Sequence, residues 1–146
     1  MTADFLSGRL FLDASVLIAA AGSPDGGSAL LLEIGQTKNI PVLVTRLILR
    51  EAERNIRMKL SEKALIRFYK IIADLDPEVI PVPTDEDLAA ASEIVATKDA
   101  HVLAGARKGK ATHLVTLDRK HFLGDDQRER VLPVVACTPG ELLRSL

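Results

Sequence analysis

The chain has 146 residues and a formal net charge of −1, and hydrophobic residues make up 47% of it. This length and composition predict a single domain over residues 1–146, with residues 1–7 expected as a flexible tail. The near-neutral charge excludes a basic coat for nucleic acid, and an aromatic content of 3% argues against a base-stacking surface. No apolar run reaches the roughly 20 residues of a membrane span and no signal peptide is recognisable, so we expect a cytoplasmic protein without membrane contact. The one cysteine, Cys137, adjoins an apolar segment and is expected to pack there.

Predicted strands and helices alternate along the chain. Apolar runs predict strands at 10–12, 41–44, 77–83, 113–117 and 131–136. Helical spacing and capping residues predict helices at 15–21, 28–36, 45–60, 61–75, 84–95 and 97–106, and after Thr138. The third strand contains prolines and is therefore expected at a sheet edge. The alternation predicts a three-layer α/β/α fold around a mainly parallel sheet, with the first strand central and the fourth beside it.

Two of the predicted strands end on an aspartate. Asp13 follows the 10–12 run, and Asp118 follows the 113–117 run. Open α/β sheets place their functional sites at the carboxyl ends of the strands. We therefore expect the two carboxylates to meet at the centre of that edge.

A third acid, Glu51, lies on the predicted helix 45–60. At about 100° per residue, the buried stripe of this helix consists of Ile48, Ala52, Ile56 and Leu60. Glu51 is displaced from that stripe toward the side that carries Arg54 and Asn55. This placement suits a half-buried functional acid, and an ordinary ion pair with Arg54 explains it equally well.

A fourth acid, Asp99, stands in the first turn of the predicted helix 97–106. One interpretation is a carboxylate that compensates the helix dipole, which is worth roughly 0.3–1 kcal/mol. The other is a further member of a cluster with Asp13, Glu51 and Asp118. Four such acids repel one another unless a cation lies among them.

The donor atoms of this expected cluster indicate the cation and the chemistry. Oxygen ligands without His or Cys favour Mg²⁺ or Mn²⁺ over zinc. Ions of this kind bind phosphates and activate a water for in-line attack on phosphorus. The four acids therefore predict hydrolysis of a phosphodiester at a carboxylate-held metal site.

Basic residues near these acids are candidate contacts to a nucleic acid. They are Arg46, Arg50, Arg54, Arg57 and His121. Three of the arginines share the solvent face of the helix 45–60, where Glu53 is placed to pair with Arg57. A solvated helix face and an exposed loop histidine are the simpler interpretations of the same residues.

The candidate acids lie in four segments with recognisable sequences. These segments are Leu12 to Val16, Glu51 with Thr45 six residues before it, Asp99 to Ala106, and Leu114 to Phe122. In this order and spacing they resemble PIN-domain ribonucleases, and they look like the VapC-like toxin branch of that family. The resemblance covers nearly the whole chain, and His121 stands where many members carry another acid.

The resemblance has implications for activity, site and partners. It implies a metal-dependent endoribonuclease, with Mg²⁺ or Mn²⁺ held by Asp13, Glu51, Asp99 and Asp118. It implies that Ser15 and Thr116 are supporting hydroxyls and that the sheet has about five parallel strands. It also implies three partners: an RNA substrate, a second copy in a homodimer, and an antitoxin protein.

Two other function classes stay open on the sequence alone. A phospho-acceptor receiver domain also gathers acids at strand ends, but it needs an aspartate after its third strand, where this chain has Pro81-Val82-Pro83. A non-catalytic PIN-like scaffold that binds RNA or protein would share the fold without the activity. Incubation with labelled RNA, with and without Mn²⁺, separates the three classes.

Overall fold

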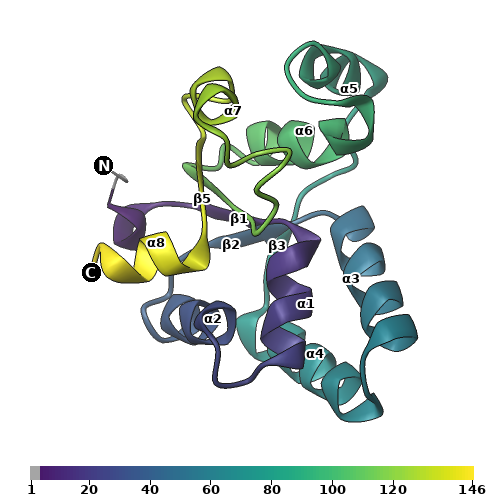
Figure 1. Cartoon of the computed structure of the whole chain (residues 1–146), viewed down its shortest axis with the longest axis vertical. Coiled ribbons are helices and arrows are strands. Elements are labelled where there is room, and N and C mark those ends of the chain that lie inside the picture. Colours follow the sequence, from purple (N-terminus) through teal and green to yellow (C-terminus); the bar gives the residue numbers. More distant parts are fainter. Residues whose placement is uncertain (1–3) are drawn as a thin grey trace.

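The computed structural model describes residues 4–146 and has a five-stranded parallel sheet at its centre (Figure 1). The strand order is β3-β2-β1-β4-β5. The strands are β1 (Leu10–Leu12), β2 (Val42–Val44), β3 (Glu78–Val79), β4 (His113–Val115) and β5 (Val135–Cys137). The predicted fold class is therefore confirmed, with β1 central, β4 beside it and β3 at an edge. The three central strands are buried throughout, which explains why their sequences are continuously apolar or nearly so.

Helices cover both faces of the sheet (Figure 1). They are α1 (Ala14–Gly22), α2 (Gly27–Thr37), α3 (Arg46–Lys59), α4 (Glu62–Leu75), α5 (Asp85–Ser92), α6 (Ala100–Lys108), α7 (Asp125–Arg130) and α8 (Pro139–Arg144). In Figure 1, α1, α2, α4 and α8 lie below the sheet, whereas α5, α6 and α7 lie above it. Within residues 4–146 no single helix is long and apolar enough to cross a membrane; α1 and α2 pass such a test only together, and they are bent by 104°.

The N-terminal residues differ from the expected tail. A 3-10 helix, η1, spans Phe5–Ser7, and the Asp4 side chain accepts a hydrogen bond from the Leu6 amide at its start. Phe5 is only 1% exposed and belongs to the core. Residues 1–3 lie outside the described part of the chain. The expectation of a tail was therefore wrong for Phe5–Ser7, because one large aromatic side chain anchors them.

Helix α3 packs on the core with the stripe that its sequence predicts. Thr45 caps its start by accepting a hydrogen bond from the Ile48 amide at 3.2 Å. Ile48, Ala52 and Ile56 are completely buried. Leu60 is 40% exposed, so its assignment to the stripe was wrong. The chain leaves the helix at this residue in an extended conformation, and its side chain no longer follows the helical period.

Helix α6 lies unusually close to the sheet because of a glycine. A Cβ atom at Gly105 would lie 2.8 Å from Cζ of Phe11 and 2.9 Å from Cγ2 of Thr45. Any side chain at this position would push α6 away from β1 and from the start of α3. The small residues of α6 thus fix the position of its N-terminus, where Asp99 stands, relative to the strand that carries Asp13.

The last strand is shorter and later than predicted. In place of the expected strand 131–136, helix α7 is followed by a turn over residues 131–134 and then by β5. Pro133 has no N–H for a strand ladder, and the Val134 amide instead closes a turn on the Val131 carbonyl at 3.1 Å. Cys137 in β5 is buried, and burial raises the pKa of its thiol to about 12, in agreement with the predicted packing role.

Candidate active site

The candidate site lies where β1 and β4 end. The two strands pair in parallel, with Leu12 opposite Val115, and the Asp13 amide donates a hydrogen bond to the Val115 carbonyl at 3.0 Å. Asp13 directly follows β1, and Thr116 and the residues after it follow β4. The two strand ends predicted from sequence therefore meet at one edge of the sheet.

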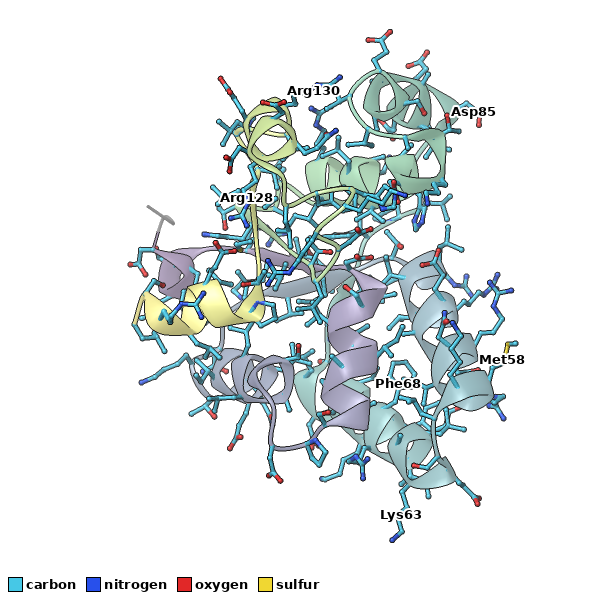
Figure 2. All side chains as sticks on the ribbon, in the orientation of Figure 1. Met58, Lys63, Phe68, Asp85, Arg128 and Arg130 are labelled. Carbon is cyan, nitrogen blue, oxygen red and sulfur yellow. The ribbon has the colours of Figure 1, made fainter. Side chains whose placement is uncertain are left out.

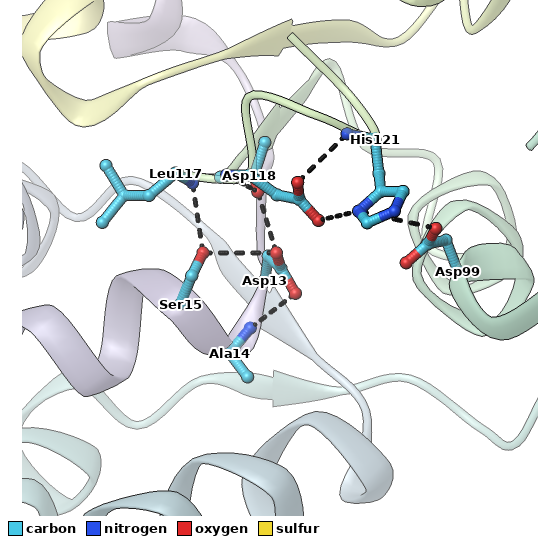
Figure 3. A network of polar contacts seen from close by, with 8 residues as sticks. Asp13, Ala14, Ser15, Asp99, Leu117, Asp118 and His121 are labelled. Carbon is cyan, nitrogen blue, oxygen red and sulfur yellow. Dashed lines mark hydrogen bonds and ion pairs between the residues drawn. The ribbon is translucent and has the colours of Figure 1, made fainter. Parts of the chain in front are cut away.

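Hydrogen bonds from three donors fix the Asp13 carboxylate (Figure 3). Its Oδ1 accepts from the Ala14 amide at 2.8 Å. Its Oδ2 accepts from the hydroxyls of Ser15 at 3.2 Å and Thr116 at 2.8 Å. The Ser15 hydroxyl also accepts from the Leu117 amide at 3.1 Å, which ties α1 to the segment after β4. Both hydroxyls that were expected to support the acids thus contact Asp13.

The electrostatic environment of Asp13 combines opposing effects. Burial, the largest of them, raises the pKa of its carboxyl group above the ordinary value. The hydrogen bonds from Thr116, Ala14 and Ser15 lower this pKa, and the nearby charge of Asp118 raises it. The net pKa is raised, because the donors offset only part of the desolvation.

Asp118 is joined to Asp13 on one side and to His121 on the other. The Thr116 hydroxyl, which donates to Asp13, accepts from the Asp118 amide at 3.0 Å. The Asp118 Oδ1 accepts from the His121 amide at 3.0 Å, and its Oδ2 lies 2.7 Å from Nδ1 of the His121 ring. The next residue, Phe122, is buried and anchors this turn.

His121 is therefore not an exposed loop residue, and that simpler interpretation was wrong. Its side chain is only 21% exposed. The signal was present in the sequence, because an aspartate side chain commonly bonds to a backbone amide a few residues further on and folds the loop back. The apolar Phe122 marks the point where the loop returns to the core.

Asp99 reaches the same place from the N-terminus of α6 (Figure 3). It occupies the N-cap position, yet its side chain makes no capping hydrogen bond. Its Oδ2 is buried without a hydrogen-bond partner among residues 4–146 and lies 3.9 Å from Nδ1 of His121. A buried carboxylate oxygen without a donor is costly, and a helix dipole alone does not satisfy it.

Glu51 is half-buried, as a functional acid would be, and it pairs with a histidine instead of Arg54. Its Oε1 lies 3.2 Å from Nε2 of His101, on α6, and not beside Arg54 as an ion pair would require. The Nδ1 atom of the same ring is buried without a hydrogen-bond partner in the described part of the chain. Sequence reasoning missed His101 as a neighbour of the site, and its place two residues after Asp99 was the only signal.

Three side chains come close enough to share one ion. In residues 4–146, Asp99, Asp118 and His121 each offer a ligand atom, and these atoms lie within 4.8 Å of one another. Asp13 adjoins this group through Thr116, whereas Glu51, on α3, contacts His101 and is not one of the three residues. His121 thus lies among the candidate donor atoms, although the four acids expected from the sequence did not include it.

The candidate RNA contacts on α3 are exposed, as predicted. A groove of about 410 Å³ is lined by Leu47, Arg50, Glu51, Glu53, Arg54 and Arg57. Arg46, at the start of α3, is exposed as well. Arg57 pairs with Glu53 at 3.7 Å, as expected, and also donates to the Tyr69 hydroxyl at 3.0 Å. Glu51 thus faces both an arginine-lined groove and His101 of α6.

A family model described as PIN domain matches residues 9–120, which is more than half of the chain. The protein belongs to the PIN domain family. Both the family and the strand order exclude a receiver domain, whose parallel sheet has the order 2-1-3-4-5 instead of β3-β2-β1-β4-β5. Comparison with curated protein sequences gives no significant match.

Solved structures share this PIN fold. PAE2754 from Pyrobaculum aerophilum is 17% identical over 97% of both chains, with a TM-score of 0.60. VapBC2 from Rickettsia felis, solved with a DNA fragment from its promoter, is 13% identical over 89% of this chain and 98% of that chain, with a TM-score of 0.62. VapC20 from Mycobacterium tuberculosis, described as a Sarcin-Ricin loop cleaving toxin, is 17% identical over 77% of this chain and 92% of that chain, with a TM-score of 0.56. At these identities the likeness concerns the fold.

Proposed function

We propose that this PIN-domain protein is a metal-dependent endoribonuclease that hydrolyses RNA phosphodiester bonds with Mg²⁺ or Mn²⁺. The observation that carries the proposal is the buried Oδ2 of Asp99, which has no hydrogen-bond donor in the described residues and faces Asp118 and His121. A bound cation would satisfy this carboxylate oxygen. Ligand atoms about 2.1 Å from one octahedral ion lie roughly 3–4 Å apart, and the separations within this group are close to that range.

The residues have separate roles in this proposal. Asp99, Asp118 and His121 would hold the ion with Asp13 beside them, and the bound ion would activate water and stabilise the leaving oxygen. Ser15 and Thr116 keep the Asp13 carboxylate in one orientation. Glu51, held by His101, would orient the attacking water.

The groove on α3 supplies a path for the RNA backbone. Arg50 and Arg54 line it together with Glu51, so phosphates bound there would lie next to that carboxylate. Replacing both arginines with Ala should weaken RNA binding mainly at low salt, and should flatten the salt dependence by roughly 1.4 in log–log slope for a single strand. Lys63→Ala, at the start of α4 (Figure 2), removes a charge on another helix and should leave the slope unchanged. An unaltered slope in the double variant would show that these arginines form a solvated helix face and do not contact RNA.

Cleavage assays test the proposed activity directly. Labelled RNA should be cut in the presence of Mn²⁺ or Mg²⁺ and left intact with EDTA. Because a metal-activated water attacks the phosphorus, the products should end in 5′-phosphate and 3′-hydroxyl groups, and 2′,3′-cyclic phosphates would contradict the mechanism. RNA binding without cleavage under all metal conditions would favour the non-catalytic scaffold.

The likeness to VapBC2 and VapC20 supports a toxin role for this nuclease. On this proposal the chain acts in the cytoplasm, forms a homodimer and is inhibited by an antitoxin protein. Induced expression of the chain alone should stop bacterial growth, and expression of the Asp118→Asn variant should not. Equal growth with both chains would contradict the toxin role and leave the nuclease activity to be judged by the cleavage assay.

A further inference from the structure

The position of His121 bears on which divalent ion the site prefers. Its ring is held by the 2.7 Å contact to Asp118 and by the buried Phe122 that follows it. Nδ1, the ring atom facing Asp118, also lies 3.9 Å from the unpartnered Oδ2 of Asp99. One imidazole nitrogen thus stands between two carboxylates that come from different elements. Because a carboxylate accepts, Nδ1–H donates to Asp118 in this structure, and binding of an ion by this nitrogen would release that proton.

We infer that His121 is a metal ligand that makes this site select Mn²⁺ or Co²⁺ over Mg²⁺. The inference rests on the proposed metal site and names the class of cation that the site takes. Mg²⁺ prefers oxygen donors and near-ideal octahedral geometry, whereas imidazole nitrogen favours first-row transition ions. A donor set of two carboxylates and one imidazole therefore discriminates against Mg²⁺.

The charge of the group formed by Asp99, Asp118 and His121 also disfavours Mg²⁺. Glu51 is paired with His101 and is not among the three residues whose ligand atoms come together. The group itself thus offers two carboxylates, because an imidazole ring takes the third position. Fewer negative oxygens lower the affinity for a strongly hydrated ion such as Mg²⁺, and the nitrogen ligand compensates only for transition ions.

The experiment measures binding of Mn²⁺, Co²⁺ and Mg²⁺ alone by calorimetry, without RNA. Wild type should bind Mn²⁺ and Co²⁺ more tightly than Mg²⁺. His121→Asp replaces the nitrogen with oxygen and should move the Mn²⁺ to Mg²⁺ preference toward Mg²⁺ by on the order of tenfold. His121→Asn should weaken Co²⁺ binding by about 10–100-fold, and Mg²⁺ binding much less.

A matched control separates ligation from charge. Lys120 is the exposed neighbour of His121, and Lys120→Gln changes the loop by the same one unit of charge as His121→Asp without adding a ligand. The control should leave the ratio of Mn²⁺ to Mg²⁺ affinity unchanged. If Lys120→Gln shifts the ratio as much as His121→Asp does, the effect is one of charge and the inference is wrong.

A spectroscopic measurement identifies the ligand independently. The chain has three histidines, His101, His113 and His121, so ring nitrogen signals of ¹⁵N-histidine-labelled protein are few. Zn²⁺, a diamagnetic probe, should shift a His121 ring nitrogen strongly and leave His113, in β4, in place. If Zn²⁺ binds and the His121 ring does not respond, the inference fails while the metal site stands. If no divalent ion binds wild type at all, both the inference about His121 and the proposed nuclease site are wrong.

Discussion

Asp13 and Asp99 are both aspartates, and they approach the candidate site from different elements. The surroundings of their carboxylates differ. Asp13 stands at the end of the central strand and accepts hydrogen bonds from an amide and two hydroxyls. Asp99 stands at the start of α6, and its Oδ2 has no hydrogen-bond donor in residues 4–146. The half of the site built on the strand ends is therefore complete within the protein, whereas the half on α6 leaves an oxygen for a ligand to satisfy.

Asp118 connects these two halves, so its removal should have the largest effect. It reaches Asp13 through Thr116 and Asp99 through His121. Asp118→Asn keeps an oxygen that can accept from the His121 amide, so the fold should persist while RNA cleavage falls by at least about a hundredfold. Asp25→Asn, in the exposed loop after α1, removes one surface carboxylate and should cleave at the wild-type rate. RNA cleavage by Asp118→Asn at the wild-type rate would contradict the proposed site.

The strand-end half should depend on one buried hydroxyl. Thr116→Val leaves the Asp118 amide without its acceptor and removes one donor from Asp13. We expect a loss of about 1–3 kcal/mol in unfolding free energy, which lowers the melting temperature by roughly 2–4 °C per kcal/mol in a chain near this size. Ser15→Ala should cost less, because the Leu117 amide that it leaves is exposed to water. Equal melting temperatures for Thr116→Val and wild type would show that this half is not held by hydrogen bonds.

The α6 half should respond in the opposite direction. Asp99→Asn removes a charge next to Asp118 at little change in volume, so the metal-free protein should gain on the order of 1 kcal/mol and melt roughly 2–4 °C higher. Mn²⁺ should then stabilise wild type more than the variant, because binding to the native state adds RT ln(1 + [L]/Kd). Thermal unfolding with and without Mn²⁺ measures both effects. If the variant melts lower and neither protein responds to metal, Asp99 is only a helix-start residue.

The smallest expected effect is a pH dependence from Asp13. Burial raises its pKa above 3.8, so the native state holds this proton more tightly than the unfolded chain does. Stability from this group is therefore greatest below about pH 4 and is lost as the pH rises through the native-state pKa.

Comparison with Asp13→Asn isolates this contribution. Asp87 and Glu141, whose pKa values are lowered, act in the opposite direction but are present in both proteins and cancel. The metal-free wild type should lose stability relative to the variant as the pH rises from about 4 through the native-state pKa of Asp13. A stability difference between the two proteins that does not change with pH would contradict the raised pKa. So would an ordinary pKa of the Asp13 carboxyl group, followed by NMR through the chemical shift of its carbon.

The sequence determined the fold class because continuous apolar runs and helical stripes are local patterns. It also determined that Asp13 and Asp118 meet, since parallel strands that are neighbours in a sheet end at the same edge. It predicted the burial of Ile48, Ala52 and Ile56 because the apolar stripe of a helix is a local pattern. The last strand was misplaced, because Pro133 ends a turn there and the helical pattern of α7 before it, acidic at its start and basic at its end, was overlooked.

Only the tertiary structure decided how the two helical acids and the histidines are arranged. Glu51 lies opposite His101 because Gly105 lets α6 approach β1 and the start of α3, and no local pattern encodes a contact between residues 50 positions apart. His121 comes close to Asp99 and Asp118 because Asp118 bonds to its amide and Phe122 is buried. A sequence states which side chains can bind a metal, but the distances among them depend on helix-to-sheet packing, which is a property of the whole fold.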